Sequence, residues 1–234
     1  MKLAYVAIAI GDKINDMKKI SLPIIKRYGK EIGCDFILIE EQTELSKQSG
    51  KIDWEKFQIY DLLNTYDRII YTDLDIIIRK DCPSLFDVVP EDCVGMYDEG
   101  HFKFDTDRQA LIKRIANHYN IPIPNYSGTY GNFGVMIASK QHREMFKQPT
   151  YKEEDKNIDL FIDQTWINVM IEHLGYKRHN LDARFNRLDP NDFLGGPSKN
   201  DSYIIHYAGL KREQVPIQMM KDILSWGYKW KDLI

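Results

Sequence analysis

The sequence predicts an α/β fold in which a mostly parallel central sheet is flanked by helices, and three features support this. The first is a nearly continuous apolar run from Leu3 to Ile10, which is typical of a strand covered on both faces. The second is a helix-like segment ending at Gly33, followed by a second apolar run from Cys34 to Ile39, which completes a β-α-β unit. The third is the run from Ile69 to Ile78, where apolar residues lead up to two aspartates and resume after them, which predicts a buried strand that ends in an acidic corner.

The composition is that of an ordinary globular protein. The 234 residues are 43% hydrophobic and 29% charged, which fits one sizeable domain with a substantial core. The net charge of -3 argues against a broad nucleic-acid surface. The three cysteines form no C-x-x-C pair, so we expect neither a disulfide scaffold nor a zinc site. This use of cysteine favours a cytoplasmic location. No run approaches the roughly 18 apolar residues of a membrane span.

The first half of the chain is expected to place a helix and a polar loop between its strands. The helix should begin near Ser21, with Pro23 in its first turn, and stop at Gly33. Its buried face carries apolar residues at helical spacing: Ile24, Ile25, Tyr28 and Ile32. The polar segment from Glu40 to Lys51 is expected to be a surface loop, whereas Trp54 to Asn64 has helical spacing.

The second half is expected to alternate strands and helices with polar loops. Strands are predicted at Cys93 to Tyr97, Asn132 to Ala138 and Tyr203 to Ile205, and helices at Asp105 to Asn120, Lys140 to Phe146 and Asp163 to Leu174. A turn-rich connection is expected at Asp81 to Pro90, and a charged, solvated segment at Tyr151 to Lys156. Loops are expected at Pro122 to Gly131 and Asn186 to Asp201, and an aromatic-bearing helix or arm at Ile217 to Ile234.

Asp73 and Asp75 stand out because buried strands rarely carry two bare carboxylates. An ionised carboxylate in an apolar setting is destabilising unless a cation or donors meet it, and two of them repel each other. Side chains at i and i+2 leave a strand on one side, so both can reach one divalent cation while Leu74 points into the core. Oxygen ligands suit Mg²⁺ or Mn²⁺. Taken alone, such a motif is more often a strand-end turn or a helix cap.

Five landmarks then occur in a consistent order: the apolar first strand, Tyr71-Thr72-Asp73-Leu74-Asp75, Asn132-Phe133-Gly134-Val135, Asp163-Gln164 and His206-Tyr207-Ala208-Gly209. In this order and spacing the chain resembles the retaining, metal-dependent glycosyltransferases of family 8, the glycogenin and lipopolysaccharide galactosyltransferase group. The resemblance spans nearly the whole chain. It implies a GT-A (Rossmann-like) fold in a single domain, 1–234, with a nucleotide-binding half (1–100), a donor-sugar and acceptor half (101–210) and a C-terminal arm (211–234).

The resemblance implies that Asp73, Asp75 and His206 bind the Mn²⁺ or Mg²⁺ ion that bridges the diphosphate of a nucleotide sugar. A bound cation suits this chemistry because it neutralises the charge that develops on the leaving group. Without the resemblance, His206 is as readily a core histidine at a strand end. Its place before Gly209, where backbone can approach a phosphate, favours the ligand role.

Basic residues are implied at the nucleotide phosphates. In the family a lysine follows the H-x-x-G segment, and here Lys211 comes one place early, with Arg212 next to it, so either can be the phosphate contact. Lys56 lies near the position where relatives use a basic residue on the nucleotide, and the alternative is a solvated helix face. Asp12 is the one residue of the first loop that suggests a contact with the base, so a uridine diphosphate donor is implied by family rather than by residues.

Asn132, Asp163 and Gln164 resemble the donor-sugar contacts of the family. Asp163 would accept hydrogen bonds from sugar hydroxyls, although a carboxylate there also stabilises a helix N-terminus. Gln164 would lie beneath the anomeric carbon. Because a neutral amide is a poor nucleophile, we hypothesise departure and attack on the same face, with Gln164 stabilising positive charge at that carbon.

These features together indicate a glycosyltransferase that moves a hexose, from UDP-glucose or UDP-galactose by resemblance, to an unidentified hydroxyl with retention. One alternative is a sugar-1-phosphate nucleotidyltransferase, although that class carries a Gly-rich basic loop after its first strand and this chain has none. Another is a binding-only relative without turnover. The acceptor can be a glycan, a lipid-linked or a protein hydroxyl, because acceptor specificity lies in variable loops. In the C-terminal arm, Trp226, Tyr228 and Trp230 can touch a membrane surface, but packing on the domain is favoured because the local charge excess is small.

Overall fold

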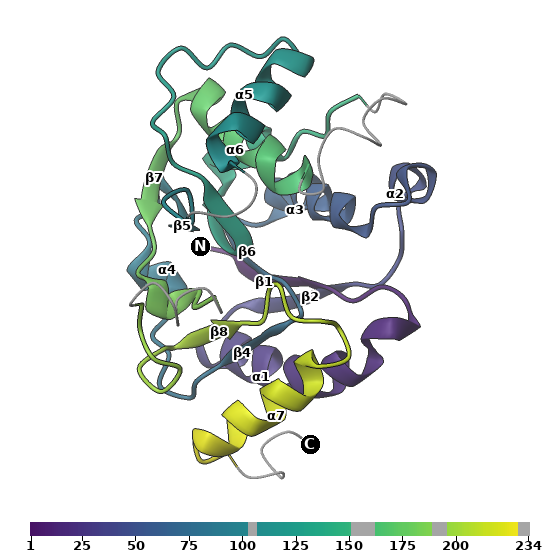
Figure 1. The fold of residues 1–234 in the computed structure, drawn as a ribbon, viewed down its shortest axis with the longest axis vertical. Helices are drawn as coiled ribbons and strands as arrows, with labels where there is room; N and C mark the ends of the chain where they lie inside the picture. The colour runs from purple at the N-terminus through teal and green to yellow at the C-terminus, as the bar shows by residue number, and fades with distance from the viewer. Residues whose placement is uncertain (103–106, 151–161, 189–195, 229–234) are drawn as a thin grey trace.

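The structure is a computed structural model that describes residues 1–102, 107–150, 162–188 and 196–228. Its centre is a six-stranded sheet in the order β2-β1-β3-β6-β5-β7, and a separate ribbon pairs β4 with β8 (Figure 1). The strands are β1 (Leu3–Ile8), β2 (Asp35–Ile39), β3 (Arg68–Thr72), β4 (Ile76–Ile78), β5 (Cys93–Asp98), β6 (Gly131–Ser139), β7 (Lys177–Asn180) and β8 (Ile204–His206). Three of the five pairings in the large sheet are parallel, and β6 runs antiparallel to both of its neighbours. The predicted α/β fold with a mostly parallel sheet is confirmed.

Helices lie on both sides of this sheet. The α-helices are α1 (Asn15–Glu31), α2 (Glu44–Ser49), α3 (Ile59–Thr65), α4 (Leu85–Val88), α5 (Arg108–His118), α6 (Ile162–Leu174) and α7 (Val215–Ser225). The 3-10 helices include η1 (Asp12–Ile14), η2 (Ile52–Gln58), η3 (Lys140–Phe146) and η5 (Ala183–Phe185). In Figure 1, α1 and α7 lie on the side of the β4-β8 ribbon, and α3, α5 and α6 lie on the opposite side. No helix among the described residues is both long enough and apolar enough to cross a membrane.

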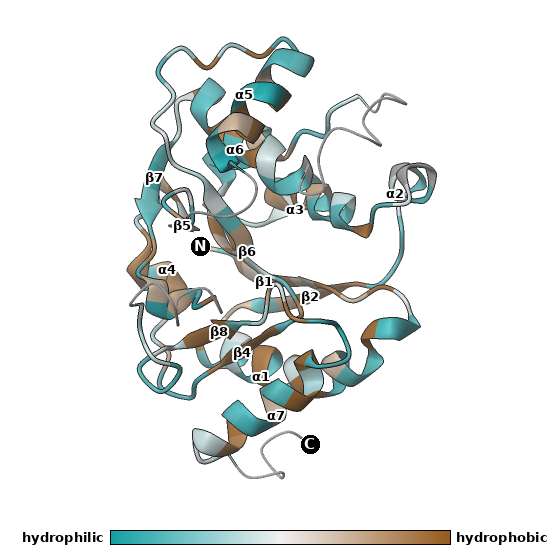
Figure 2. Cartoon of the chain, in the orientation of Figure 1, coloured by the Kyte–Doolittle hydropathy of each residue, from teal (hydrophilic) through white to brown (hydrophobic). Residues whose placement is uncertain are grey.

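The core is divided in two by the sheet, because alternate strand residues face opposite sides. On β1, Tyr5 packs into the cluster that contains residues of α1 and α7, whereas Ala4 and Val6 pack into the cluster of α3, α5 and α6. On β3, Ile70 faces the first cluster and Ile69 the second. All five side chains are fully buried. In Figure 2 much of the central sheet is coloured as hydrophobic, whereas the edge strand β7 is hydrophilic. Both faces of β1 and β3 are therefore covered, which explains why the sequences of these strands are continuous apolar runs, as predicted.

Helix α1 differs from the prediction at its start. It begins at Asn15, so Pro23 lies inside the helix rather than in its first turn. Because proline has no N–H, one hydrogen bond of the helix is missing there. Burial of the neighbouring Ile24 and Ile25 in the core stabilises the helix. The end is as predicted: the chain leaves the helix at Gly33, whose φ of 73° favours glycine.

The predicted buried strand that ends in an acidic corner is confirmed, and the apolar residues after the corner form a second strand. β3 ends at Thr72, and β4 begins at Ile76 in the separate ribbon, where it pairs with β8. The turn between them is held from α1, where the hydroxyl of Ser21 donates to the carbonyl of Leu74. The two aspartates therefore lie at a corner between two sheets, and Leu74 packs into the core as predicted.

Several shorter elements were not predicted. The supposed surface loop from Glu40 to Lys51 contains α2, which Thr43 caps by accepting a hydrogen bond from the backbone N–H of Ser46. β7 was missed because it is a charged edge strand with no fully buried residue, so it lacks an apolar pattern. The predicted helix from Lys140 to Phe146 is a 3-10 helix. The segment from Tyr151 to Lys156, predicted to be solvated, lies outside the described residues.

Candidate active site

The corner after β3 brings three metal-competent side chains together. The N–H of Asp73 donates to the carbonyl of Gly134 on β6, and the N–H of Tyr207 donates to the carbonyl of Asp75. The antiparallel register of β4 and β8 puts Ile76 opposite His206. These pairings fix both aspartates against the end of β8, although 130 residues of the chain lie between Asp75 and His206.

The imidazole of His206 faces both carboxylates. Its Nε2 lies 3.4 Å from Oδ1 of Asp75 and 3.8 Å from Oδ2 of Asp73, and one ligand atom from each of the three residues lies within 4.8 Å of the others. Burial alone lowers the pKa of His206, but the facing aspartates raise it above its ordinary value overall. Burial alone raises the pKa of Asp75, but His206 lowers it below its ordinary value overall. Two carboxylates and one imidazole form a donor set that fits Mn²⁺ or Mg²⁺.

Lys56 lies between this acidic corner and the start of α6. Its Nζ is 2.9 Å from Oδ2 of Asp163 and 3.3 Å from Oδ1 of Asp73, and its side chain is almost fully buried. Burial alone lowers the pKa of Lys56, but these carboxylates raise it well above its ordinary value overall. The ammonium group therefore stays charged. The burial of Lys56 rules out the alternative interpretation, in which this residue lies on a solvated helix face.

Two amides face the same space from β6 and α6. The N–H of Phe133 donates to Oε1 of Gln164 at 2.9 Å, and Nε2 of Gln164 donates to Glu99 at 2.9 Å. Asn132 donates to the second oxygen of Glu99 at 2.8 Å. Glu99 is only 2% exposed, and Arg108 lies 3.3 Å from the oxygen that Gln164 contacts. One buried carboxylate thus holds both amides.

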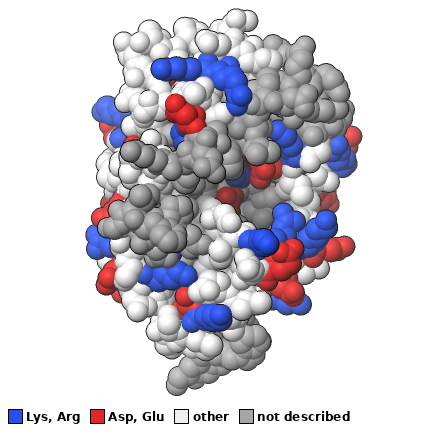
Figure 3. All heavy atoms as spheres, in the orientation of Figure 1, with Lys and Arg blue, Asp and Glu red and all other residues white. Residues whose placement is uncertain are grey.

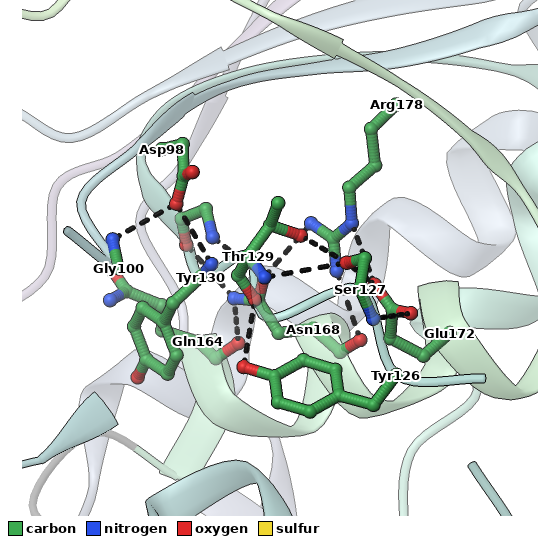
Figure 4. Close-up of polar contacts among 11 residues, drawn as sticks. Asp98, Gly100, Tyr126, Ser127, Thr129, Tyr130, Gln164, Asn168, Glu172 and Arg178 are labelled. Atoms are coloured by element: carbon green, nitrogen blue, oxygen red, sulfur yellow. Dashed lines mark hydrogen bonds and ion pairs between the residues drawn. The ribbon is translucent and has the colours of Figure 1, made fainter. Parts of the chain in front are cut away.

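A polar network fixes the Pro/Gly/Tyr loop before β6 onto α6 and β7 (Figure 4). The hydroxyl of Ser127 donates to Glu172 at 2.9 Å, and the guanidinium of Arg178 lies 3.1 Å from the same oxygen. Arg178 also donates to Oδ1 of Asn168, whose Nδ2 donates to the carbonyl of Gln164. This network supports the first turn of α6, where Gln164 lies.

The site residues line two adjoining cavities. One has a volume of about 590 Å³ and is lined by isoleucines and other aliphatic side chains together with Arg212. The second, of about 450 Å³, is lined by polar groups: Glu99, Arg108, Asn132, Asp163, Gln164, His206 and Gly209 among them. Asp53, Lys56, Asp73 and Asp75 line both. The acidic corner therefore lies at the junction of the two cavities.

Most of the sequence-predicted site residues come together at this junction. Lys56, Asn132, Asp163, Gln164 and Gly209 join the acidic corner there. Asp12 lies in η1 and Lys211 follows β8, and neither lines the two cavities, whereas Arg212 lines the larger one.

Glu99 and Asp53 were not predicted from the sequence. Glu99 follows the carboxyl end of β5, the end at which ligands gather in such sheets, and this position is the signal that could have found it. Asp53 lies in a 3-10 helix and carries no comparable signal.

Comparison with known proteins places these features in a family. The family model described as Glycosyl transferase family 8 matches residues 4–211. Among curated proteins, none matches the chain. The described fold nevertheless has clear counterparts among solved structures.

Three of those structures illustrate the likeness. A glycosyltransferase involved in the glycosylation of the major capsid of PBCV-1 has a TM-score of 0.60 at 10% identity, covering 94% of this chain and 100% of that one. The galactosyltransferase LgtC, solved with donor and acceptor sugar analogs, has a TM-score of 0.57 at 14% identity, covering 99% and 100%. GlyE of Streptococcus pneumoniae TIGR4 has a TM-score of 0.60 at 14% identity, covering 100% of this chain and 62% of that one. The predicted GT-A fold is confirmed.

Proposed function

The chain belongs to glycosyltransferase family 8 and is a glycosyltransferase, and we propose that it is a retaining, metal-dependent one. In this proposal it moves a hexose from a nucleotide-diphosphate sugar, UDP-glucose or UDP-galactose, to a hydroxyl group. The observation that carries the proposal is the convergence of Asp73, Asp75 and His206 at the junction of the two cavities.

In the proposed complex, each of the two cavities binds a different part of the donor. The larger one offers aliphatic contact for a base and ribose, and its Arg212 can meet phosphate oxygens. The smaller one offers carboxylates and amides that can form hydrogen bonds with sugar hydroxyls. A diphosphate lying between them would pass the acidic corner, where Asp73, Asp75 and His206 would hold Mn²⁺ or Mg²⁺. When bound, the cation would neutralise charge that develops on the leaving diphosphate.

In the proposed reaction the acceptor hydroxyl attacks the anomeric carbon from the face that the diphosphate leaves. The donor C–O bond breaks with its electron pair on the phosphate oxygen, the new C–O bond forms, and the acceptor proton passes to that phosphate. Gln164 stabilises positive charge at the anomeric carbon with its amide oxygen, because Phe133 and Glu99 hold that amide in one orientation.

Asp163 is proposed to accept sugar hydroxyl hydrogen bonds rather than to act as a nucleophile. Its carboxylate forms a close ion pair with Lys56, and a carboxylate engaged with an ammonium group is a weaker nucleophile. Asn132 contributes a further donor to the sugar, since one Nδ2 hydrogen remains after its bond to Glu99. Isolation of a covalent glycosyl-enzyme on Asp163 would contradict this assignment.

The acceptor is proposed to be a glycan, a lipid-linked or a protein hydroxyl rather than nucleic acid. Basic and acidic side chains are interspersed on the face drawn in Figure 3 and do not gather into one basic surface. In the C-terminal arm, Tyr228 is buried and donates to the carbonyl of Ile78, and Trp226 donates to the carbonyl of Lys199. These two aromatic side chains favour packing on the domain over contact with a membrane, whereas Trp230 lies outside the described residues.

The proposal is tested by isothermal titration of UDP, with GDP as the control nucleotide, in Mn²⁺ and then in EDTA. We expect UDP to bind only with Mn²⁺, and Asp75→Ala to abolish binding because it removes one of three protein ligands. Hydrolysis and transfer assays with UDP-glucose and UDP-galactose would then identify the sugar. Failure of both nucleotides to bind in Mn²⁺ would refute the donor-site assignment.

A further inference from the structure

The ring of His206 is held from behind by a buried asparagine. Nδ1 of His206 lies 2.9 Å from Oδ1 of Asn186, on the side of the ring away from the aspartates, and Asn186 is fully buried. The segment that carries Asn186 runs beside β8: Arg187 donates its N–H to the carbonyl of Ile204 and accepts from the N–H of His206. The backbone therefore fixes Asn186 next to this ring.

The direction of each hydrogen bond follows from a backbone group that can only donate. The N–H of Gly134 donates to the side chain of Asn132 at 2.9 Å, so that atom is the amide oxygen. Asn186 contacts the same oxygen at 2.9 Å and must do so with its Nδ2. Its Oδ1 then faces His206, and the ring must carry a proton on Nδ1.

The other end of the chain of bonds is also fixed. With its oxygen occupied, Asn132 presents Nδ2 to Oε2 of Glu99, a carboxylate that accepts at both of its oxygens. If the amide of Asn132 or Asn186 were turned over, exchanging its oxygen and nitrogen, two donors or two acceptors would face each other. At the His206 end of this series of hydrogen bonds, the lone pair on Nε2 of the neutral ring therefore faces Asp73 and Asp75.

We propose that Asn186 is a positioning residue that holds His206 in the Nδ1-protonated tautomer, with Nε2 free to bind a divalent cation. The proposal rests on the proposed metal site, but the tautomer can be measured without metal or nucleotide. Residues that orient a metal-bound histidine through its other nitrogen typically contribute about 10- to 100-fold to metal affinity.

The first test is the tautomer of His206 in the metal-free protein. Nitrogen-15 NMR of histidine-labelled protein, at a pH where the ring is neutral, should give the Nδ1-protonated form, with the signal assigned by its absence in His206→Gln. Asn186→Ala should lose this preference. An Nε2-protonated ring in the wild type overturns the proposal, even if Asn186→Ala does not fold.

The second test is the affinity for Mn²⁺ in the presence of UDP, followed by the electron paramagnetic resonance of free Mn²⁺. Asn186→Ala should bind Mn²⁺ about 10- to 100-fold more weakly. Asn186→Asp still accepts from Nδ1 but places an oxygen against Oδ1 of Asn132, so it should keep the Nδ1-protonated tautomer and lose less affinity than Asn186→Ala. Ser139→Ala is the control: Ser139 is also buried, but its hydroxyl donates to the carbonyl of Glu91 at the end of β6 away from Asn132, so the tautomer and the affinity should not change.

Three outcomes of the second test overturn the proposal: an unchanged Mn²⁺ affinity in Asn186→Ala, an equal loss in Asn186→Asp, or an equal loss in Ser139→Ala. Absence of Mn²⁺ binding in the wild type would instead refute the proposed function, and the NMR measurement would still decide the role of Asn186.

Discussion

His206 lies directly against the backbone of Gly134, so closely that a methyl group on Gly134 would be 2.0 Å from Cε1 of the ring. β6 and β8 belong to different sheets, and this contact is where they meet. The ring is therefore confined between the strand, Asn186 and the two aspartates. Glycine is required here for space, because the same methyl group would also overlap both ring nitrogens.

Gly134→Ala should therefore displace His206 and weaken Mn²⁺-dependent UDP binding at least tenfold, as expected for a misplaced metal ligand. Isothermal titration would measure the change. Gly29→Ala is the control, because a methyl group there meets nothing closer than 3.6 Å and the residue lies within α1. That substitution should leave binding intact and stabilise the helix by about 0.5–1 kcal/mol. Normal binding by Gly134→Ala would disprove the steric argument.

Lys56→Met should destabilise the protein, because it leaves Asp73 and Asp163 without the ammonium group that they share. Loss of one partner from a buried ion pair costs about 3–5 kcal/mol. Chemical denaturation in EDTA would measure this loss, and saturating Mn²⁺ should reduce it by supplying positive charge to Asp73. Lys47→Met removes an exposed ion pair with Glu44 and should have no measurable effect. Equal stability of the two variants would show that Lys56 is not the central charge of the site.

Glu99→Gln should impair hydrolysis of the donor sugar although it changes almost no volume. The carboxylate accepts from Asn132 and Gln164 at its two oxygens, whereas a glutamine would oppose an NH₂ group to one of them. A mismatched buried hydrogen bond costs about 1–3 kcal/mol, so the rate should fall about 10- to 100-fold. Glu99→Asp keeps the charge and should recover more activity than Glu99→Gln. The opposite order would argue against the acceptor role.

Arg178→Met should loosen the network drawn in Figure 4, because Arg178 bonds to both Glu172 and Asn168. Removal of this buried partner should cost about 3 kcal/mol of unfolding free energy and speed amide exchange at Ser127 and Thr129. The neighbouring Lys177→Met removes only a surface pair with Asp92 and should leave exchange unchanged. Unchanged exchange in Arg178→Met would mean that the loop is held by other contacts.

Asp53 predicts a pH-dependent stability. The Asp163 carboxylate, and then burial, raise the pKa of Asp53 from 3.8 to about 6. Because the folded-state value is the higher one, ionisation of Asp53 opposes folding, and its penalty grows as the pH rises between those two values. Asp53→Asn should therefore raise the melting temperature in EDTA at neutral pH and have no such effect below the unfolded pKa.

Asp92 is the control with the opposite sign. Its hydrogen bond with Lys177 lowers the pKa of Asp92, so its contribution to stability is present at neutral pH and is lost as the pH falls through the folded-state pKa. Asp92→Asn should lower the melting temperature slightly at neutral pH and not at low pH. The same pH profile for both variants would contradict the assigned electrostatics.

The sequence by itself determined the elements whose signal is local. Apolar runs gave β1 and β2, helical spacing and Gly33 gave the end of α1, and the i, i+2 spacing singled out Asp73 and Asp75. These features could be predicted because burial on both faces of a strand and the pitch of a helix impose a periodicity that is visible within a few residues. The family resemblance depended on the same local motifs in their order along the chain.

Only the tertiary structure decided which of these groups meet. The pairing of β4 with β8 puts His206 beside Asp75, and the antiparallel β6 brings Gly134 under the ring. Glu99 is a shared acceptor because packing brings it beside Asn132 and Gln164. The residues next to Glu99 in the sequence do not indicate these buried partners. Strand register and packing link residues that are far apart in the chain, and no local periodicity records that link.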